Sequence, residues 1–545
     1  MKFVTDALDR QTYYTYTSAG EVESVTTASG TTNYEYDNLG RLTDLTDEQG
    51  LVTHNEYDDA GHLLKTTRNY VSSRPQNDEN KYNLVTEYRY DVRGNLIAVI
   101  DTYGIITRTY YDLADRPVTV VQNLVGQTIE AVTPPAGGTG LSDENIRMDT
   151  VYDEAGNVIA TIDPAGVITR TYYDQANRPV TTVQNLTGQD IGVVTPPSYS
   201  PAAPDQNIRM DTVYDANGNV IASIDTAGVI TRTYYDELNR PKTIVQNLLG
   251  QDISIATPPG RGTSANIRVD MYYDANGNAI ATVDPKGIIT RTYYDSLNRP
   301  ITVVQNLAGQ AINDATPPAA GVDANVRSDT YYDKAGNVIA AVDPRGMVTR
   351  TYYDEANRPV ATLQNWTGTD LYGDLSTAPA YNPAVPYENV RTTVAYNADG
   401  YRDTTTDPLD RVTKYEYNEV GQLLKVTANY LNGGVPQNDQ DQRNIVTEYD
   451  YDALGRQINT TDTSGRVAVN VYDDLGRVTT VTQNYLQGQS QNYKDASGNR
   501  YNLITSYSYD VRGNQIAVTD TAGVVSRMYY DALGRSVAAV HNLVG

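Results

Sequence analysis

A Tyr-Asp dipeptide returns along almost the whole chain with two alternating spacings. Eighteen motif tyrosines carry it, from Tyr36 to Tyr530, and Asn replaces Asp after two of them, Tyr396 and Tyr417. Every odd step from Tyr to Tyr is 21 residues, whereas the even steps are 33 to 43 residues. A fixed period of this kind is typical of repeat architectures. One repeat is therefore a pair of motifs, and the tyrosines form nine pairs: 36/57, 90/111, 152/173, 214/235, 273/294, 332/353, 396/417, 451/472 and 509/530.

Each motif has the composition of a tight turn. The residue four places after the motif Tyr is Gly in thirteen copies, Asn in four and Asp in one, all of which tolerate positive φ. An Asp at the start of a turn can bind the backbone two residues on. A second turn of this kind begins eleven residues after the first Tyr of each pair. The repeat residues that carry this prediction are Tyr36, Asp37, Gly40, Tyr152, Asp153, Gly156, Asp163, Gly166, Tyr173, Asp174, Asn185, Tyr332, Asp333, Gly336, Tyr530 and Asp531.

The segments between these turns are predicted to be strands. Residues 157–162 and 167–173 are rich in β-branched and aromatic side chains and have strand length. An Asn stands twelve residues after the second Tyr of every pair, as at Asn185, and begins a longer insertion. Because antiparallel strands return every second turn to the same edge, we expect all the long loops on one edge and the short Asp-x-x-Gly turns on the other.

Four strands in each of nine pairs give about 36 strands, and open twisted sheets rarely exceed about 10 without curling. Neither face of the segment 167–173 is purely apolar, so a dry sandwich is not expected. The sequence predicts an all-β fold, a ribbon of antiparallel hairpins coiled into a hollow spiral tube or shell. We expect residues 1–35 to be a degenerate partial repeat. Residues 36–545 would be one continuous array and a fragment of a longer repeat protein.

Composition narrows the possible partners. The net charge of −25 disfavours nucleic acid and anionic membranes, which need basic patches. No apolar run approaches the roughly 20 residues that span a bilayer, so we expect no membrane insertion. The absence of Cys excludes disulfides and thiolate sites. The chain has 46 Tyr but one Phe and one Trp. We therefore expect the aromatic side chains to be partly exposed to solvent, because each Tyr hydroxyl needs water or another hydrogen-bond partner.

Candidate chemistry is sparse. We predict no catalytic, cofactor-binding or metal-binding residues: the acids are explained as turn-formers, and the three His are scattered. A basic residue stands three places before the second Tyr in seven of nine pairs. It predicts either a cross-strand ion ladder with acids such as Asp149 and Asp211 or an anion-binding stripe. Asn185 and Asn365 begin glycosylation sequons, and we interpret this fixed Asn as a strand-end cap.

The motif closely resembles the YD repeat of the RHS family, as in Tyr36-Asp37-Asn38-Leu39-Gly40-Arg41-Leu42 and in residues 472–478. The resemblance covers essentially the entire chain. It implies a β-hairpin ribbon wound into a hollow shell, as in bacterial polymorphic toxins, the cocoon of insecticidal toxin complexes, wall-associated proteins and teneurins. In the toxins, the shell holds a C-terminal effector.

Two roles follow, neither of them enzymatic. The first is an extracellular or cell-surface scaffold, filament or adhesion element, which would contact copies of itself, further repeats end to end, or a surface glycan. The alternative is the wall of a toxin cage that encloses an effector polypeptide. The near-identical internal repeats favour the scaffold, and we predict that role from the sequence. The extracellular or cell-surface location is implied by the resemblance.

Overall fold

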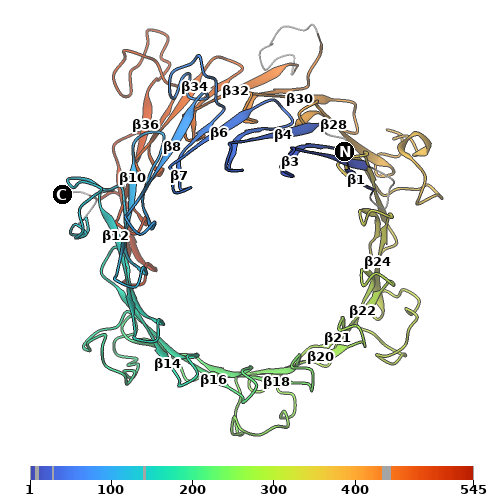
Figure 1. Ribbon diagram of the computed structural model, residues 1–545. Helices are drawn as coiled ribbons and strands as arrows, with labels where there is room; N and C mark the ends of the chain where they lie inside the picture. The colour runs from blue at the N-terminus through green and yellow to red at the C-terminus, as the bar shows by residue number, and fades with distance from the viewer. Residues whose placement is uncertain (1, 6–10, 28–29, 139–142, 433–442, 544–545) are drawn as a thin grey trace. The chain divides into compact units, whose positions relative to one another are not determined.

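The computed structural model describes residues 2–5, 11–27, 30–138, 143–432 and 443–543. The described residues form 39 strands in one antiparallel sheet, with one short 3-10 helix, η1 (Leu375–Thr377). Figure 1 shows strand following strand along the chain, with long loops between some of them. The predicted ribbon of antiparallel hairpins is confirmed.

The strands are β1 (Lys2–Thr5), β2 (Gln11–Tyr16), β3 (Val22–Thr26), β4 (Thr31–Tyr36), β5 (Leu42–Thr46), β6 (Val52–Tyr57), β7 (Leu63–Arg68), β8 (Leu84–Tyr90), β9 (Leu96–Ile100), β10 (Ile106–Tyr111), β11 (Pro117–Gln122), β12 (Ile146–Tyr152), β13 (Val158–Ile162), β14 (Ile168–Tyr173), β15 (Pro179–Gln184), β16 (Ile208–Tyr214), β17 (Val220–Ile224), β18 (Ile230–Tyr235), β19 (Pro241–Gln246), β20 (Ile267–Tyr273), β21 (Ala279–Val283), β22 (Ile289–Tyr294), β23 (Pro300–Gln305), β24 (Val326–Tyr332), β25 (Val338–Val342), β26 (Val348–Tyr353), β27 (Pro359–Gln364), β28 (Val390–Tyr396), β29 (Arg402–Thr406), β30 (Val412–Tyr417), β31 (Leu423–Ala428), β32 (Ile445–Tyr451), β33 (Gln457–Asp462), β34 (Val467–Tyr472), β35 (Val478–Gln483), β36 (Leu503–Tyr509), β37 (Gln515–Thr519), β38 (Val525–Tyr530) and β39 (Ser536–Val540).

The repeat pairs map onto strands in groups of four. Strands β4 to β39 supply four strands to each of the nine pairs, and β1 to β3 precede them. Each motif Tyr is the last residue of its strand, as Tyr152 is in β12 and Tyr173 in β14. The two predicted segments become β13 and β14 with ends shifted by one residue.

The motif turn is a hairpin with a bulge. Gly156 donates its amide to the carbonyl of Asp153 (3.2 Å), and Asp153 donates its own to the carbonyl of Asn157 (3.0 Å). Gly156 has φ +89°, and the strand register shifts at Tyr152. This is a type I turn followed by a left-handed residue, which leaves one residue bulged. At all eighteen motif turns, the fourth residue after Tyr has φ between +57° and +93°.

The two edges of the sheet are unlike. The motif turns that follow each motif Tyr share one edge, here called the motif edge, because every second connection returns there. The opposite edge, the loop edge, carries the long loops, as predicted. It also carries the second Asp-x-x-Gly turns, such as Asp163–Gly166 between β13 and β14. The expectation that all short turns line the edge opposite the loops is therefore wrong for this second class.

The apolar core is divided into small clusters, about one for each repeat in the middle of the chain. Tyr234, Val245 and Leu248 form one of them, and Tyr293, Val304 and Leu307 form the corresponding cluster of the next repeat. In each cluster, the Leu belongs to the long loop, which therefore packs on the strand face that carries the Tyr and Val. We call this face the covered face and the other the open face. The loops bury the apolar side chains without a second sheet.

The chain forms two compact units. Unit 2 comprises Thr169–Thr393, and unit 1 comprises Met1–Ile168 together with Val394–Gly545. Among the described residues, no helix is long and apolar enough to cross a membrane.

Candidate functional site

The motif Tyr bonds to the strand beside its own. The hydroxyl of Tyr152 donates to the carbonyl of Pro117 at 3.1 Å, and that of Tyr214 donates to Pro179 at 3.0 Å. Both prolines are the first residue of the preceding strand. Among the described residues, the bond is present at Tyr36, Tyr57, Tyr111, Tyr152, Tyr214, Tyr235, Tyr273, Tyr294, Tyr332, Tyr353, Tyr451, Tyr472, Tyr509 and Tyr530. A Phe could not satisfy these carbonyls, which explains why Tyr stands at the motif positions.

The motif Asp organises its own turn. In Asp174, one carboxylate oxygen accepts the amides of Ala176 and Arg178, and the other accepts Arg178 Nε at 2.8 Å. These bonds, led by the one from the Arg178 amide, lower the pKa of Asp174. The guanidinium of Arg178 also lies 4.6 Å from the ring centroid of Tyr214, a cation–π contact. One motif turn is thereby tied to the next along the motif edge.

The Asn that begins each long loop is hydrogen-bonded to a second Asn at the end of the same loop. We call these two asparagines the clasp. Asn185 accepts the backbone amide of Asn207 at 2.9 Å and donates its side-chain amide to the carbonyl of Asp205 at 2.6 Å. Asn207 accepts the amide of Thr187 on its side-chain oxygen at 2.9 Å. Both asparagines have positive φ, +50° and +48°. Asn185 is 8% exposed, so the sequon Asn is a structural residue at the strand end.

Sequence reasoning missed the second Asn of this clasp. It lies seven residues before the first Tyr of eight pairs, so its regular spacing is visible when positions are counted backward from that Tyr. Its distance from the first Asn differs from repeat to repeat, because the loops differ in length. The backbone bond that closes the loop recurs in all eight, between Asn69 and Asn83, Asn123 and Asn145, Asn185 and Asn207, Asn247 and Asn266, Asn306 and Asn325, Asn365 and Asn389, Asn429 and Asn444, and Asn484 and Asn502.

Five arginines of the basic row lie on the covered face beneath the loops. Arg108, Arg170, Arg232, Arg291 and Arg350 are only 3–6% exposed. Arg232 Nε donates to the loop carbonyl of Ile253 at 2.9 Å, and its guanidinium lies 4.5 Å from the ring centroid of Tyr234. Burial lowers the pKa of Arg232 and raises that of Tyr234.

The predicted cross-strand ion pair is formed by Lys414, which contacts Asp403 of the adjacent strand at 2.5 Å, but not by Asp149 and Asp211. Asp149 and Asp211 instead form ion pairs at 2.9 Å with Arg147 and Arg209, two residues earlier on their own strands. Asp149 also accepts the hydroxyl of Thr119 from the adjacent strand at 2.6 Å. The five buried arginines of the row therefore anchor the loops through backbone carbonyls.

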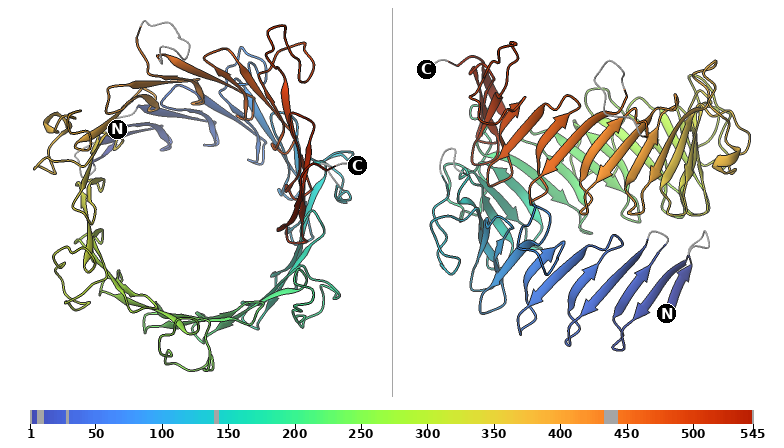
Figure 2. Two further views of the ribbon diagram at one scale, coloured as in Figure 1. Left: turned by 180° about the vertical axis from the view of Figure 1, so that it is seen from behind. Right: turned by 90° about the horizontal axis from the view of Figure 1, so that it is seen from above.

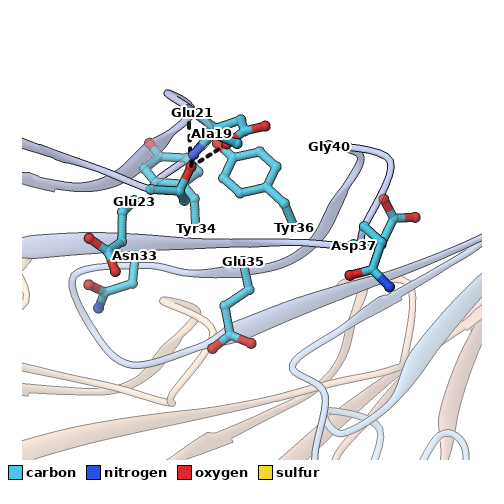
Figure 3. Close-up of a pocket in the computed structure, with 11 residues that line it drawn as sticks. Ala19, Glu21, Glu23, Asn33, Tyr34, Glu35, Tyr36, Asp37 and Gly40 are labelled. Atoms are coloured by element: carbon cyan, nitrogen blue, oxygen red, sulfur yellow. Dashed lines mark hydrogen bonds between the residues drawn. The ribbon is translucent and has the colours of Figure 1, made fainter.

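An acidic pocket lies near the beginning of the array. It has a volume of about 710 Å³ and is lined by Glu21, Glu23, Glu35 and Asp37, among others. Figure 3 shows Glu35 and Asn33 on the opposite side of their strand from Tyr36. A hydrogen bond from Thr17 lowers the pKa of Glu21. Among the residues that the structure describes, no group of three His, Asp or Glu side chains is arranged to hold a metal ion.

The open face of unit 2 carries small neutral side chains where neighbouring strands pair. Thr212 faces Ser223, which faces Thr231 on the next strand, and Thr351 faces Thr362. Across these middle positions of the described strands, the residues are Thr171, Thr182, Met210, Thr212, Ser223, Thr231, Thr233, Ile244, Val269, Met271, Thr282, Thr290, Thr292, Val303, Ser328, Thr330, Ala341, Thr349, Thr351, Thr362 and Thr392, none of them charged.

Within unit 1, two segments of the sheet about 350 residues apart meet edge to edge (Figure 2). We call this contact the seam. Tyr103 Oη accepts the amide of Ala453 at 3.0 Å, and Arg512 pairs with Asp163 at 2.7 Å. The other seam bonds are Gln49 to Asp399, Asn123 to Asp474 and Asp474 to Asp143, at 3.1–3.2 Å. In each bond, a loop-edge residue of the early segment meets a motif turn of the late segment, so the two edges engage in a regular order.

Parts of this chain resemble known proteins in sequence. The RHS Repeat model matches residues 152–189, 214–250, 273–311, 332–370 and 509–542. A curated relative, the double-stranded DNA deaminase toxin A of Burkholderia cenocepacia (strain H111), is 24% identical over 417 residues, which is 73% of this chain and 27% of the relative.

Solved structures share the fold of this chain. A crystal structure of TcdB2-TccC3-TEV covers 99% of this chain with a TM-score of 0.54 at 16% identity, and the match spans 27% of that chain. The Photorhabdus luminescens Tc holotoxin pore covers 92% with a TM-score of 0.51 at 14% identity, over 26% of its chain. This chain thus spans about a quarter of the length of the proteins it matches. With its paired Tyr-Asp motifs and these five matched segments, the chain carries RHS repeats, and its hairpin sheet has the fold of the TcdB2-TccC3 structures.

Proposed function

We propose that this chain is a segment of the wall of a toxin shell that encloses an effector polypeptide. The observation that carries the proposal is the fold likeness to TcdB2-TccC3 over 99% of the chain, together with a toxin as a curated relative. The cage, which the sequence offered as the alternative, is thereby favoured over the scaffold, filament or adhesion element. The wall itself would be structural, and any catalysis would belong to the enclosed effector.

The open face supports this role. A wall that holds an unrelated polypeptide must not bind it tightly, and fixed charges would attract or repel particular sequences. The middle positions of the open face in unit 2 offer hydroxyls and small apolar groups, such as Thr231, Thr282 and Val303. Fixed charges such as Arg232 and Asp270 lie on the covered face instead.

The seam supports enclosure. A ribbon whose loop edge binds its own motif edge closes the gap between two passes of the sheet. The bond of Tyr103 to Ala453 and the ion pair of Arg512 with Asp163 are contacts of this kind within unit 1, and they support the proposal. We further propose that the shell is released from the cell and assembles with a TcdB2-like partner chain, by analogy with the named complexes.

Protease protection tests the enclosure. The full-length natural protein is treated with thermolysin, and the fragments are identified by mass spectrometry. We expect the enclosed polypeptide to survive in the wild type and to be cleaved in a Tyr103→Phe, Arg512→Ala seam variant. Tyr372→Phe is a control, because Tyr372 is a loop residue that is 71% exposed. Equal cleavage of the polypeptide in the wild type and the seam variant, with the repeats intact in both, would contradict the proposal.

A further inference from the structure

The 36/57 repeat carries histidine at two positions where most pairs carry a basic residue. Three places before the second Tyr, seven of nine pairs have Arg or Lys, and this pair has His54. Five places after the second Tyr, seven of nine pairs have Arg, and this pair has His62. A histidine changes its charge between about pH 5 and 8, whereas an arginine stays charged. This repeat therefore differs from its neighbours by two side chains that can gain or lose a proton.

His62 makes the contacts of a motif Arg. Its Nδ1 lies 2.8 Å from Asp58 Oδ2, and its ring stacks on that of Tyr90 with the centroids 4.7 Å apart. In other repeats the motif Arg likewise bonds to its own Asp and covers the ring of the next motif Tyr, as Arg178 covers Tyr214 at 4.6 Å. The hydrogen bond from His62 lowers the pKa of Asp58. The imidazole and the ionised carboxylate therefore form a linked pair.

The second ring nitrogen of His62 lies close to the following motif turn. A Cβ placed on Gly94 would be 2.9 Å from Nε2. Because Nδ1 must carry a hydrogen to face the Asp58 carboxylate, Nε2 of a neutral ring is an acceptor without a hydrogen. Protonation adds a donor at Nε2 and a positive charge, which strengthens both the bond to Asp58 and the stacking on Tyr90.

His54 links two strands and the beginning of a long loop. Its Nδ1 lies 2.7 Å from Oδ1 of Asp44 on the neighbouring strand β5, and its ring stacks on Tyr70 with the centroids 4.6 Å apart. The amide of Tyr70 donates to the carbonyl of Val52 at 2.8 Å, so this end of the loop is held against β6. The side chains of His54 and His62 are 25% and 32% exposed. Both rings can therefore exchange protons with solvent.

The charged groups around the two rings leave each carboxylate dependent on its histidine. On the face of His54, Glu35 stands opposite Asp44, and Glu56 is paired with Lys65 at 2.9 Å. Among the described residues, Asp44 and Asp58 have no ion-pair partner besides these histidines. The charged groups of the motif turns on either side of His62 are Arg41, which donates to the carbonyl of Asp58 at 2.6 Å, Asp91, and Arg93, which pairs with Asp115 at 2.9 Å.

We propose that His54 and His62 form a pH-sensitive latch, which holds the hairpin of β6 and β7 when both rings are protonated. The latch is strongest near pH 5, where the rings are charged and carboxylates are still ionised. It is lost as the pH rises toward 8 and the rings become neutral. Because each repeat of such an array contacts only its neighbours, the change is local to this repeat. The inference goes beyond the enclosure of a polypeptide and does not depend on it.

The latch lies beside the seam. Strands β5 and β6 are joined by the turn that carries Gln49, and the side chain of Gln49 donates to the carbonyl of Asp399 at 3.2 Å. The bond between His54 and Asp44 crosses the same two strands. Release of His54 therefore loosens the strands that position Gln49, and the seam contact at Asp399 should weaken together with the hairpin.

Hydrogen exchange with mass spectrometry on the full-length natural protein tests the latch. Exchange is followed at pH 5.5 and 7.5, and each protection factor is corrected for the intrinsic exchange rate at that pH. Residues 52–68 report the hairpin, and residues 397–401 report the seam contact. Residues 168–184 of the 152/173 repeat are the internal comparison, because Arg stands at both positions there.

Two double variants use residues that other pairs carry at the same positions. One fixes the charge with His54→Arg and His62→Arg, and the other removes it with His54→Val and His62→Gln. His541→Gln is the matched control, because it changes a histidine outside the 36/57 repeat. The residues that occupy the two positions elsewhere in the chain include Arg108, Arg116, Val469 and Gln422.

In the wild type, we expect the protection factors of residues 52–68 to rise about three-fold or more from pH 7.5 to 5.5, with those of residues 397–401 rising and those of residues 168–184 unchanged. The arginine variant should be protected at both pH values and the Val/Gln variant at neither, while His541→Gln should behave as the wild type. No rise in residues 52–68, an equal rise in residues 168–184, or an undiminished rise in either double variant would each overturn the proposal. A rise in residues 52–68 without one in residues 397–401 would overturn the link to the seam.

Discussion

The backbone amide of Asn207 donates to the carbonyl of Asn185 across 2.9 Å and closes the long loop between them. Because both residues adopt positive φ, the chain can leave one strand and enter the next at a fixed separation, whatever lies between. Loops of different length and sequence can therefore join the same two strands without changing the sheet. The loops closed by Asn69 with Asn83 and by Asn365 with Asn389 are examples.

Breaking the clasp should open the loop without unfolding the sheet. Asn185→Gly combined with Asn207→Gly keeps positive φ accessible but removes three side-chain bonds to the backbone, each worth about 1 kcal/mol. We expect faster amide hydrogen exchange and faster proteolysis in residues 186–206, with β15 and β16 still protected. Asn217→Ala serves as the control, because Ala155 and Ala335 occupy the same repeat position. Loop protection equal to that of the wild type would contradict the clasp.

The motif hydroxyl should stabilise the sheet. Tyr214→Phe removes the bond to Pro179 at 3.0 Å and leaves a carbonyl without its partner, so we expect a loss of about 1 kcal/mol in the free energy of unfolding. Chemical denaturation measures it, with Tyr372→Phe on an exposed loop as the comparison. An equal loss in the free energy of unfolding in both variants would mean that the bond from Tyr214 to Pro179 does not stabilise the sheet.

The left-handed turn position should discriminate sharply between side chains. At Gly156, an added Cβ would meet no atom within 4 Å, so the φ of +89° is the constraint. We expect Gly156→Val to lower the free energy of unfolding by about 1–3 kcal/mol, whereas Gly156→Asn should cost less, because Asn177 adopts φ +57° at the equivalent place. Thermal unfolding of the two variants side by side measures the difference, and equal midpoints would refute this account of the turn.

The motif carboxylates should make the fold sensitive to acid. Hydrogen bonds, led by those from the backbone amides of Arg178, Arg240 and Arg299, lower the pKa values of Asp174, Asp236 and Asp295. A carboxylate with a lowered pKa in the folded state stabilises the fold above its ordinary pKa of about 4. That stabilisation is lost as the pH falls through the folded-state value.

We therefore expect the free energy of unfolding to be level between about pH 7 and 5 and to fall below about pH 4. Replacing the three Asp by Asn, as Asn397 and Asn418 naturally do in their motifs, should make this decline shallower. Urea unfolding at a series of pH values tests it. An identical pH profile for the variant would exclude these carboxylates as the cause.

The sequence predicted what depends on local backbone chemistry. The strand that ends at Tyr173, the turn at Gly156 and the loop that starts at Asn185 each follow from residue types at fixed offsets, and the described strands and turns lie there. Asn207 escaped prediction because its offset from Asn185 varies among repeats, although its offset from Tyr214 does not.

Contacts between distant parts of the chain could not be read from the repeats. For Arg232, the row of like charges predicts either an acidic partner on a neighbouring strand or a bound anion. Instead, the loop returns over the covered face and presents the carbonyl of Ile253 to its guanidinium. The seam depends in the same way on how far the sheet bends over many strands, which no single motif records. Tyr103 and Ala453 are 350 positions apart.

Electron cryomicroscopy of the full-length natural protein tests the central claim most directly. If this chain is part of a toxin shell, the particles should be closed and discrete, with the hairpin sheet as their wall and density for a polypeptide inside. Open tubes or filaments that grow by end-to-end contact, with no internal density, would contradict this claim. They would favour the role as a scaffold or filament instead.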